Sequence, residues 1–501
     1  MINTDTSSRG ASSAPASHRA RGGWSPSAAT IWPVLIFASA LAIRWVRIHA
    51  APDVFSDELE YTSIARHLAA TGTLEDFLGN HQLGIFFTHP PLYFAIAAVF
   101  EKITANADPR YLCGFIGAIT AVQLYYLGRS IRGMRVGIIA GSYFAFSPLA
   151  VHIDRMGMIE ALATALTVAF VQIICRGIAR GTGRVWVISS GLALGMLFLT
   201  KELLIFMVPF LLITAVLYRR RLPLSKVMAI IAIGAGCWAI YAACSSAIDA
   251  SLFWSVKTEA LRRLTGEQVT TGYALPRYPS PFADIETRGW EIIPDALMGI
   301  IALVGCTARV RHRNIRSAEA LALIWLLSVG GFLLAGKIYN FQFVVYLVPP
   351  AALGGALALG SINGNRQALR IWQARIYVAV ALITAAAISD IYRYGFTTDM
   401  ALTETATWVN THLPARTLLY APVEFNWLSP QDGIVNPYYF PSLEKVERLD
   451  IHWVIISPRT TYMLYPQTLN YITKYGHVVE RFYGDTLLEV DVIYLPSGLG
   501  H

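Results

Sequence analysis

Apolar runs of membrane-spanning length recur through the first four fifths of the 501-residue chain, and they constrain its fold more than any motif does. A helix needs about 20 predominantly apolar residues to cross a bilayer. The composition agrees, because 55% of the residues are hydrophobic and only 14% are charged. The sequence therefore predicts a mainly α-helical, polytopic membrane protein and argues against a soluble fold.

Basic residues are concentrated in five short loops between apolar runs. These loops together hold 17 Lys and Arg and no Asp or Glu; they are residues 129–135, 176–184, 219–226, 309–316 and 361–375. Because short cytoplasmic loops carry an excess of Lys and Arg, the net charge of +8 reports membrane orientation rather than nucleic-acid binding. We expect all five loops, and a disordered tail over residues 1–27, to be cytoplasmic.

This orientation fixes the expected topology of the module at residues 28–395. We expect about 11 transmembrane helices, at residues 31–50, 111–128, 136–152, 158–175, 185–200, 202–218, 227–245, 291–308, 317–335, 338–360 and 376–394. Loops 51–109 and 246–290 then face the extracytoplasmic side. Residues 396–501, which are rich in Tyr and Pro, follow the last span and predict a small soluble α/β domain on that side.

The first extracytoplasmic loop carries the most informative pattern. Asp57 and Glu58 stand side by side soon after the first span, and Ser56 before them is the expected N-cap of a short amphipathic helix. Farther along, His89 precedes two prolines, and residues 92–104 are apolar but too short to span. We expect that stretch to lie at the membrane interface or to re-enter the bilayer.

Asp57 is the candidate general base of this loop. A carboxylate held at a partly buried membrane boundary can have its pKa raised, and it can then take a proton from an attacking hydroxyl. Glu58 points away from Asp57 on a helix, so we expect it to orient neighbouring groups or to cap the helix. The structural alternative for both is simple complementation of the helix dipole by acidic residues in the first turn.

A second acidic cluster lies at the outer mouth of two later spans. For Asp154 and Arg155 we favour a local ion pair, whereas Glu160 lies one turn into an apolar helix, where ionisable residues are commonly functional. On the same side of the membrane, cations able to hold a phosphate stand at Arg110, Lys201 and Lys337. Each alone could be an interfacial anchor, as we expect for Arg44 and Arg47, and Glu202 could instead neutralise Lys201.

The ordered combination of these features resembles the GT-C membrane glycosyltransferases. The shared features are the acidic pair after the first span, the HPPL element, an arginine opening the next span, an acidic residue after the third span, a Thr-Lys turn and a soluble C-terminal domain. The resemblance covers about residues 30–350. The most similar groups are the protein O-mannosyltransferases, the bacterial aminoarabinose transferases of lipid A, and related bacterial enzymes.

The resemblance implies transfer of a sugar from a polyprenyl-phosphate donor to an acceptor on the outer side of the plasma (inner) membrane, with inversion at the anomeric carbon. Asp57 matches the catalytic acid of the first loop and Glu58 its partner. Glu160 matches the second acidic position, although Asp154 could also hold it. The residues matched to the donor-phosphate site are His89, Arg110, Lys201, Lys337 and Tyr346.

Two departures narrow the expected acceptor. His89 stands where the aminoarabinose transferases have lysine, so lipid A modification is not indicated. The mannosyltransferases' extra domain in the long loop is missing from loop 246–290, which favours a cell-envelope glycan or lipid over protein as acceptor. No nucleotide or redox cofactor is implied. A divalent metal ion is not required, because cations are already present; the residues able to hold one would be Asp57, Glu58, His89 and Glu160.

Two other classes of function remain open from the sequence. A flippase or transporter of lipid-linked sugars would also gather charge around a substrate, but it would be expected to carry repeated halves or discontinuous helices, which the sequence does not suggest. A noncatalytic envelope-assembly protein would bind through its C-terminal domain and would keep its activity when Asp57 is replaced.

Overall fold

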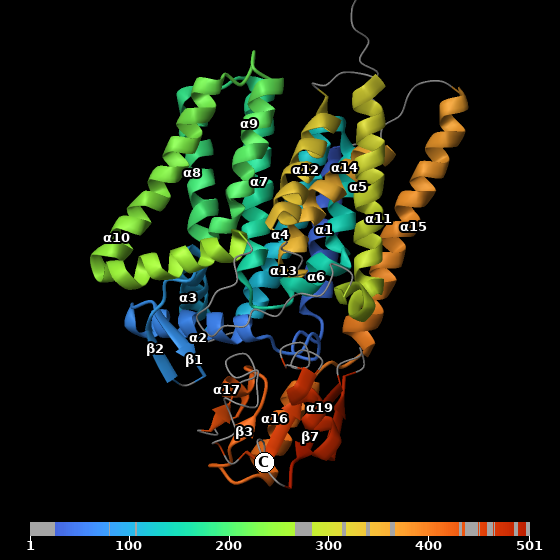
Figure 1. Ribbon diagram of the computed structural model, residues 1–501. Helices are drawn as coiled ribbons and strands as arrows, with labels where there is room; N and C mark the ends of the chain where they lie inside the picture. The colour runs from blue at the N-terminus through green and yellow to red at the C-terminus, as the bar shows by residue number, and fades with distance from the viewer. Residues whose placement is uncertain are drawn as a thin grey trace, which may run out of the picture.

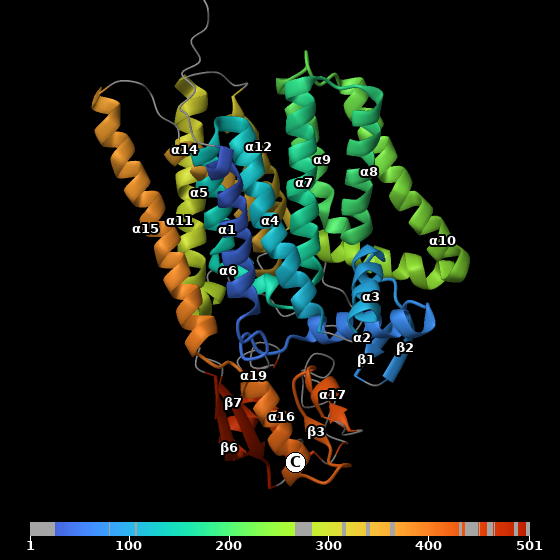
Figure 2. The same ribbon diagram turned by 180° about the vertical axis from the view of Figure 1, so that it is seen from behind.

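The computed structural model describes residues 26–79, 81–105, 108–265, 283–312, 317–336, 341–360, 366–429, 433–435, 449, 451–457, 464, 466–484 and 489–496. A helical bundle forms the body of the molecule, and a small domain with a β-sheet lies beyond one end of it (Figure 1). The view from behind shows the same two parts, with the first loop between the bundle and the small domain (Figure 2). The beginning of the first helix lies at the opposite end (Figure 1).

The bundle is built from apolar helices at the positions that the sequence predicts. Its elements are α1 (Pro26–Trp45), α4 (Pro109–Arg132), α5 (Met134–Ala145), α6 (Pro148–Asp154), α7 (Ile159–Arg180), α8 (Arg184–Thr200), η1 (Glu202–Phe206), α9 (Met207–Leu217), α10 (Leu224–Thr265), α11 (Ala283–His312), α12 (Ala318–Gly336), α13 (Phe341–Val344), η2 (Val345–Leu347), α14 (Val348–Gly360) and α15 (Arg366–Phe396).

Among the described residues, seven helices are long and apolar enough to cross a membrane, and the bent pair α5 and α6 makes an eighth. Three shorter apolar helices, Thr30–Trp45, Arg184–Thr200 and Glu202–Leu217, occupy the other positions where the sequence predicts spans. The mainly α-helical, multi-pass membrane fold is therefore confirmed, whereas the count of 11 spans stays a prediction because the short helices fall below spanning length.

The first loop folds into two helices and a hairpin between them: α2 (Ser56–Thr71), β1 (Glu75–Leu78), β2 (His81–Ile85) and α3 (Leu92–Thr104). Tyr61, Ile64 and Ala65 give α2 its buried face, and Gly72, in the left-handed region at φ 80°, ends it. The expected N-cap is wrong. Phe55 holds the cap position without a side-chain hydrogen bond, and Ser56 is already the first helical residue. Helix α3 has the bounds that the sequence predicts.

The predicted loop 246–290 is largely helical where it is described. Helix α10 breaks at Asp249 (φ −149°, ψ 97°) and continues to Thr265, and its second part runs across the end of the bundle (Figure 1). The Asp249 carboxylate accepts the Leu252 N–H and the Ser251 hydroxyl, both at 2.9 Å, so it caps the second part as an N-terminal cap would. Residues 266–282 lie outside the described part of the chain.

The C-terminal domain is the α/β unit that the sequence predicts. Its elements are α16 (Ala401–His412), β3 (Leu419–Tyr420), α17 (Phe425–Leu428), β4 (Ile434–Val435), β5 (Trp453–Ile456), α19 (Pro466–Tyr475), β6 (His477–Tyr483) and β7 (Glu489–Tyr494). The strand order is β4-β3-β5-β7-β6. Strand β3 runs parallel to β4 and β5, and β7 runs antiparallel to β5 and β6.

The domain is attached to the first loop by a helix cap, in which a residue before α2 caps the beginning of α16. The carboxylate of Asp53, which is buried, accepts the Leu402 N–H at 2.7 Å and the Thr403 hydroxyl at 2.9 Å. These groups belong to the first turn of α16, whose own N-cap residue, Met400, makes no side-chain cap. Asp53 therefore satisfies backbone donors that a helix beginning otherwise leaves without partners.

Candidate active site

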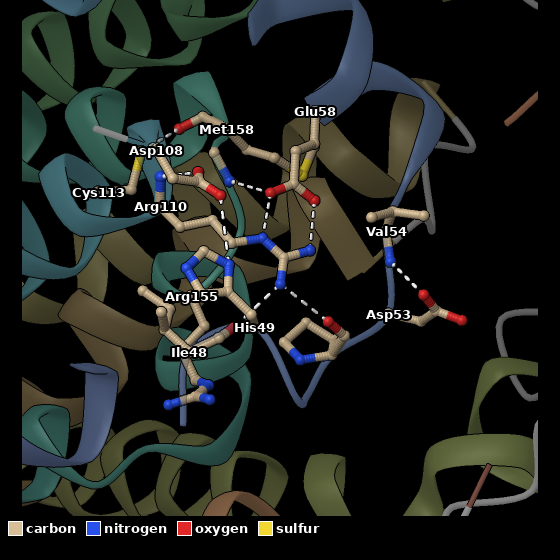
Figure 3. A network of polar contacts seen from close by, with 12 residues as sticks. Ile48, His49, Asp53, Val54, Glu58, Asp108, Arg110, Cys113, Arg155 and Met158 are labelled. Carbon is tan, nitrogen blue, oxygen red and sulfur yellow. Dashed lines mark hydrogen bonds and ion pairs between the residues drawn. The ribbon is translucent and has the colours of Figure 1, made fainter. Parts of the chain in front are cut away.

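Glu58 on α2 and Arg110 at the beginning of α4 form a buried ion pair, shown in Figure 3. Arg110 donates from Nη2 to Oε2 of Glu58 at 2.8 Å and from Nε to Oε1, while its Nη1 donates to the carbonyls of Ile48 and Pro52 at 3.0 Å. The Gly157 N–H also reaches Glu58, at 3.0 Å. The pair thus joins α2, α4 and the chain between α6 and α7 at one point.

Asp154 pairs with Arg44 and not with its neighbour in sequence, so the expected pair with Arg155 is wrong. Arg44 Nε lies 2.9 Å from Asp154 Oδ2, and both residues are buried. Successive helical residues point about 100° apart, which favours a partner on another helix over the adjacent residue. Arg155 instead donates to backbone carbonyls in the last turn of α1 and just after it; these belong to Ile43, Arg44, Val46, Arg47 and Ala51.

The expectation that Arg44 and Arg47 are interfacial anchors is also corrected. Arg44 is fully buried, and its Nη1 donates to the Ala145 carbonyl at 2.8 Å. Arg47 lies after the end of α1, where it donates to the Gly395 carbonyl at 2.9 Å and to the Thr398 hydroxyl at 3.0 Å. Both arginines therefore bond other elements of the protein. The sequence had suggested that they contact lipid headgroups.

Asp57 faces a different set of groups from Glu58. Its Oδ2 accepts a hydrogen bond of 3.2 Å from Nε2 of Gln342, which lies on α13 far along the chain. Glu160, at the beginning of α7, forms a buried ion pair with Lys201, which separates α8 from η1. Phe343, the neighbour of Gln342 on α13, has its ring centroid 4.6 Å from Lys201 Nζ, so the residue that bonds Asp57 adjoins the Glu160–Lys201 pair, and the charges of both members act on Asp57. The structure thus brings together three of the charged residues that the sequence singled out.

The pairing of Lys201 differs from the alternative drawn from the sequence. Lys201 Nζ bonds Oε1 of Glu160 and lies 4.6 Å from the centroid of the Phe343 ring. Glu202, the expected neutralising neighbour, instead pairs with Lys257 at 2.6 Å. The chain is extended at Lys201 (φ −156°, ψ 121°), so adjacent side chains leave it in opposite directions.

The pKa of Asp57 is raised to about 6, above the ordinary value of 3.8. Burial is the main cause, because it disfavours the charged carboxylate, and the negative charge of Glu160 adds to it. Lys201 and the hydrogen bond from Gln342 act in the opposite direction. A carboxylate with a pKa near 6 is ionised at neutral pH and is still basic enough to accept a proton.

Several buried polar atoms around the Glu160–Lys201 pair have no hydrogen-bond partner among the described residues. They are Oε2 of Glu160, the Tyr346 hydroxyl and the Thr164 hydroxyl. Thr164 lies one helical turn after Glu160, and η2, which carries Tyr346, packs against α7. Because native proteins rarely leave buried polar atoms unpaired, this is a place where a polar ligand would restore lost hydrogen bonds.

The remaining predicted residues are placed as follows. His89 is half-buried, with its ring centroid 5.7 Å from that of Tyr61, which lies one turn after Asp57 on α2. Lys337 falls outside the described residues. Within the described ranges, no three His, Cys, Asp or Glu side chains are grouped so that they could hold a metal ion.

Sequence reasoning missed Gln342, Phe343 and Tyr61. Gln342 is 4% exposed, and a buried amide inside the apolar run before Pro349 was a usable signal that we did not read. Phe343 and Tyr61 carried no signal, because aromatic side chains in apolar helices usually belong to a core.

The arrangement can be compared with that of known proteins. The structure of ArnT from Cupriavidus metallidurans bound to undecaprenyl phosphate matches with a TM-score of 0.55 and 16% identity, over 93% of this chain and 98% of ArnT. The oligosaccharyltransferase AglB from Archaeoglobus fulgidus, in complex with an inhibitory peptide and a dolichol-phosphate, matches with a TM-score of 0.62 and 13% identity, over 92% and 74% of the two chains. The chain has the GT-C fold. The fold that this resemblance implies is therefore confirmed.

Of the two sequence comparisons, one finds a match over part of the chain. The family model described as dolichyl-phosphate-mannose-protein mannosyltransferase matches residues 88–243. A search of curated proteins finds no significant match. The matched segment includes Glu160 and Lys201 of the candidate site, whereas Asp57 precedes it.

Proposed function

We propose that this GT-C protein transfers a sugar from a polyprenyl-phosphate donor to a hydroxyl of an extracytoplasmic glycan or lipid. The observation that carries the proposal is the convergence of Asp57 with the Glu160–Lys201 pair, beside buried polar atoms that have no partner among the described residues. A base and a phosphate-binding cation are what displacement of a sugar from a phosphate requires.

The donor phosphate would bind at Lys201. An ammonium group has three N–H donors, and in the described part of the chain Lys201 uses one of them, toward Glu160. The others can point at a phosphate oxygen, and the Tyr346 hydroxyl can donate a further hydrogen bond. The ammonium charge would then stabilise the phosphate as it departs. Lys337 and His89 remain predicted contributors to the same subsite.

Arg110 and Glu58 would have a structural role in the reaction site. Every nitrogen of the Arg110 guanidinium already donates to Glu58 or to a backbone carbonyl, so we assign this arginine to holding α2 in place. Asp154 is engaged by Arg44 in the same way. Glu160 is therefore our choice for the second acidic position that the sequence left open between these two residues.

The chemical step we propose is a single displacement. The acceptor oxygen attacks the anomeric carbon, its proton passes to the Asp57 carboxylate, and the bond from the anomeric carbon to the phosphate oxygen breaks. The electron pair of that bond leaves with the polyprenyl phosphate, and the anomeric configuration is inverted. The basic loops 129–135, 176–184 and 219–226 lie at the end of the bundle opposite the first loop (Figure 1), which supports placing this site on the extracytoplasmic side.

The test is donor turnover followed by mass spectrometry. Purified protein is incubated with a total lipid extract of the host membrane, and loss of polyprenyl-phosphate sugar and release of free polyprenyl phosphate are measured for wild type and Asp57→Asn. We expect Asp57→Asn to lower the rate by about 10² to 10⁴-fold, because general base catalysis is lost. Glu404→Gln, which likewise replaces a carboxylate with its amide but at an exposed position on α16, is the control and should keep the wild-type rate.

The outcomes separate a glycosyltransferase from a transporter and test the role of Asp57. Wild-type turnover that Asp57→Asn lacks supports a glycosyltransferase, and the mass lost from the donor identifies the sugar. Donor binding without turnover in any protein, with acceptor lipids present in the extract, would favour a transporter of lipid-linked sugars. Equal turnover in wild type and Asp57→Asn would remove Asp57 from the proposed mechanism.

A further inference from the structure

Helix α13 reaches both the proposed base and the proposed phosphate-binding cation. Nε2 of Gln342, a side chain that is 4% exposed, donates to Oδ2 of Asp57 at 3.2 Å. The next residue, Phe343, has its ring centroid 4.6 Å from Nζ of Lys201, within the range of a cation–π contact. Two consecutive residues of one short helix therefore contact the two charged groups on which the proposed chemistry depends.

The rest of this segment also faces the site. Helix α13 continues into the 3-10 turn η2, which packs against α7 and carries Tyr346. Tyr346 follows Gln342 by four residues and Phe343 by three, so the three side chains share a helical face. The buried Tyr346 hydroxyl has no hydrogen-bond partner among the described residues. The segment therefore presents an amide, an aromatic ring and an unpaired hydroxyl to the site.

The amide fixes one oxygen of Asp57 and leaves the other for the reaction. Gln342 bonds Oδ2, whereas Oδ1 has the Ser56 hydroxyl 3.4 Å away, at the long end of hydrogen-bond distances. An amide N–H is a neutral donor, so it orients the carboxylate while lowering its basicity less than a cation at the same place would. The carboxylate is held in one orientation and stays able to accept a proton.

We propose that Gln342 is a positioning residue for the transfer reaction: it orients the Asp57 carboxylate toward the attacking hydroxyl, while Phe343 holds Lys201 for the departing phosphate. In a single displacement the base and the leaving group act on opposite sides of the anomeric carbon, so their separation has to be maintained. Neighbouring residues of one helical turn set this separation. This inference rests on the proposed function.

Other ionisable groups also interact electrostatically with Asp57, and replacing Gln342 leaves all of them in place. They are Glu60 and Tyr61 on α2, Glu160 on α7, Lys201 at the junction of α8 with η1, and Glu424 at the N-cap position of α17. Gln342 bears no charge, so an uncharged replacement removes a hydrogen bond without removing a charge. A change in the pKa of Asp57 then reports that hydrogen bond.

The sign of the effect follows from the direction of the hydrogen bond. A donor to a carboxylate favours its charged form, so Gln342 lowers the pKa of Asp57, which burial raises. Asp57 must be ionised to act as a base, so the rate falls as the pH drops through its pKa of about 6. Removing the donor should raise this pKa and move the acid limb of the pH profile to higher pH.

The experiment measures turnover by the full-length protein. Release of polyprenyl phosphate from pH 4.5 to 8.5, at increasing amounts of the host lipid extract, gives the maximal rate and the amount of extract that supports half of it. Gln342→Met removes the donor and keeps the length of the side chain, and Gln342→Asn keeps the amide but shortens its reach. The control is Gln373→Met, the same change at an exposed position on α15. Melting temperatures across this pH range check that each variant is folded.

We expect Gln342→Met to retain about tenfold less of its pH 8 rate at pH 5 than wild type does, because the pKa of Asp57 rises by about 1. At pH 8, where Asp57 is ionised in both proteins, its maximal rate should fall about tenfold through loss of orientation, with the half-saturating amount of extract changed by less than about threefold. Gln342→Asn should behave in the same way, since its amide stops short of Asp57. Gln373→Met should match wild type.

Phe343→Leu separates the two contacts of the segment. It removes the ring from Lys201 and leaves the Gln342 donor in place. We expect the half-saturating amount of extract to rise about threefold, while the acid limb stays where it is in wild type. A limb that moves as far in Phe343→Leu as in Gln342→Met would overturn the proposal, because either change would then simply loosen the segment.

A folded Gln342→Met whose acid limb coincides with that of wild type also overturns the proposal. So does failure of both Gln342→Met and Gln342→Asn to fold, because Gln342 is then required for the fold itself. These outcomes are distinguishable from failure of the proposed function. If wild type shows no turnover, or if Asp57→Asn turns over at the wild-type rate, the function is wrong. If Asp57→Asn is inactive and the limb does not move in folded Gln342→Met, only the inference about Gln342 is wrong.

Discussion

Two buried ion pairs at the end of the bundle nearest the C-terminal domain differ in how completely their atoms are used. In the Glu58–Arg110 pair, both carboxylate oxygens and all three guanidinium nitrogens have hydrogen-bond partners (Figure 3). In the Glu160–Lys201 pair, one contact is made, and Oε2 of Glu160 has no partner among the described residues. The first pair behaves as a structural joint, and the second keeps hydrogen-bonding capacity for a ligand.

The difference shows how charge at a membrane boundary can be assigned. Taking two charges out of water costs several kcal/mol per ion, and only a fully satisfied network recovers most of that cost. An incompletely satisfied pair therefore lowers stability, and it persists where binding or catalysis needs it. By this criterion Glu58, Arg110, Arg44 and Asp154 belong to the scaffold, whereas Glu160 and Lys201 belong to the proposed site.

Arg110→Met tests the structural pair and should have the largest effect on stability. It leaves the Glu58 carboxylate buried without its cation and releases the carbonyls of Ile48 and Pro52, so we expect a loss of about 3 to 5 kcal/mol. The measurement is the melting temperature and the yield of monodisperse protein in detergent. The double variant Glu58→Gln with Arg110→Met should recover part of the loss. A stable, inactive Arg110→Met would instead place Arg110 in the chemistry.

Lys201→Met tests the incompletely satisfied pair and should have the opposite profile. We expect kcat/KM to fall by about 10² to 10³-fold, because the departing phosphate loses its cation. The melting temperature should fall less than in Arg110→Met, since Lys201 makes fewer contacts. Turnover and melting temperature are compared in the same preparation, with Lys102→Met on α3 as the control. A larger loss of stability in Lys201→Met than in Arg110→Met would contradict the comparison.

The positions of the helices could be predicted from the sequence, but most of their pairings could not. Apolar runs mark the helices because burial in lipid depends on local composition. The partners of Arg44, Glu58 and Lys201 depend on which helix faces which, and these partners lie 110, 52 and 41 residues away in the chain. Neither pairing offered between sequence neighbours, Asp154 with Arg155 or Lys201 with Glu202, is found, for this reason.

Part of the candidate site could be predicted from the sequence, because it too depends on local composition. Asp57, Glu160 and Lys201 are ionisable groups at the ends of apolar segments, and such groups stand out against the composition around them. Gln342 was harder to find because an amide costs less to bury than a charge. The cap that Asp53 provides to α16 could not be read at all, since it joins residues 349 positions apart.

The pH profile sharpens the contrast between the two members of the incompletely satisfied pair. With both neighbours present, the pKa of Asp57 is about 6. Lys201 lowers this pKa and Glu160 raises it. For wild type we expect kcat/KM to fall about tenfold per pH unit below pH 6. Residual activity in Glu160→Gln should show this limb at lower pH, and that in Lys201→Met at higher pH. Limbs that shift in the same direction in both variants would contradict the assigned charges.

Glu101 on α3 offers a smaller test of the same principle outside the proposed site. Its carboxylate is fully buried, both oxygens have no hydrogen-bond partner among the described residues, and Arg66 Nε lies 3.5 Å from Oε1. Burial raises its pKa from 4.5 to about 7, with Arg66 acting in the opposite direction. The folded state therefore binds a proton more tightly than the unfolded state between these values, and its stability falls as the pH rises through 7.

Glu101→Gln should remove this loss of stability. We expect its melting temperature to exceed that of wild type by about 1 to 3 °C at pH 8, and the two to converge at pH 5, where wild-type Glu101 is already protonated. Differential scanning fluorimetry in detergent at both pH values measures this, with exposed Glu404→Gln as the control. A lower melting temperature for Glu101→Gln at pH 8 would mean that the attraction of Arg66 outweighs the cost of burying the charge. In that case an incompletely satisfied ion pair could still stabilise the fold, and the criterion that separates the two pairs would hold for the proposed site alone.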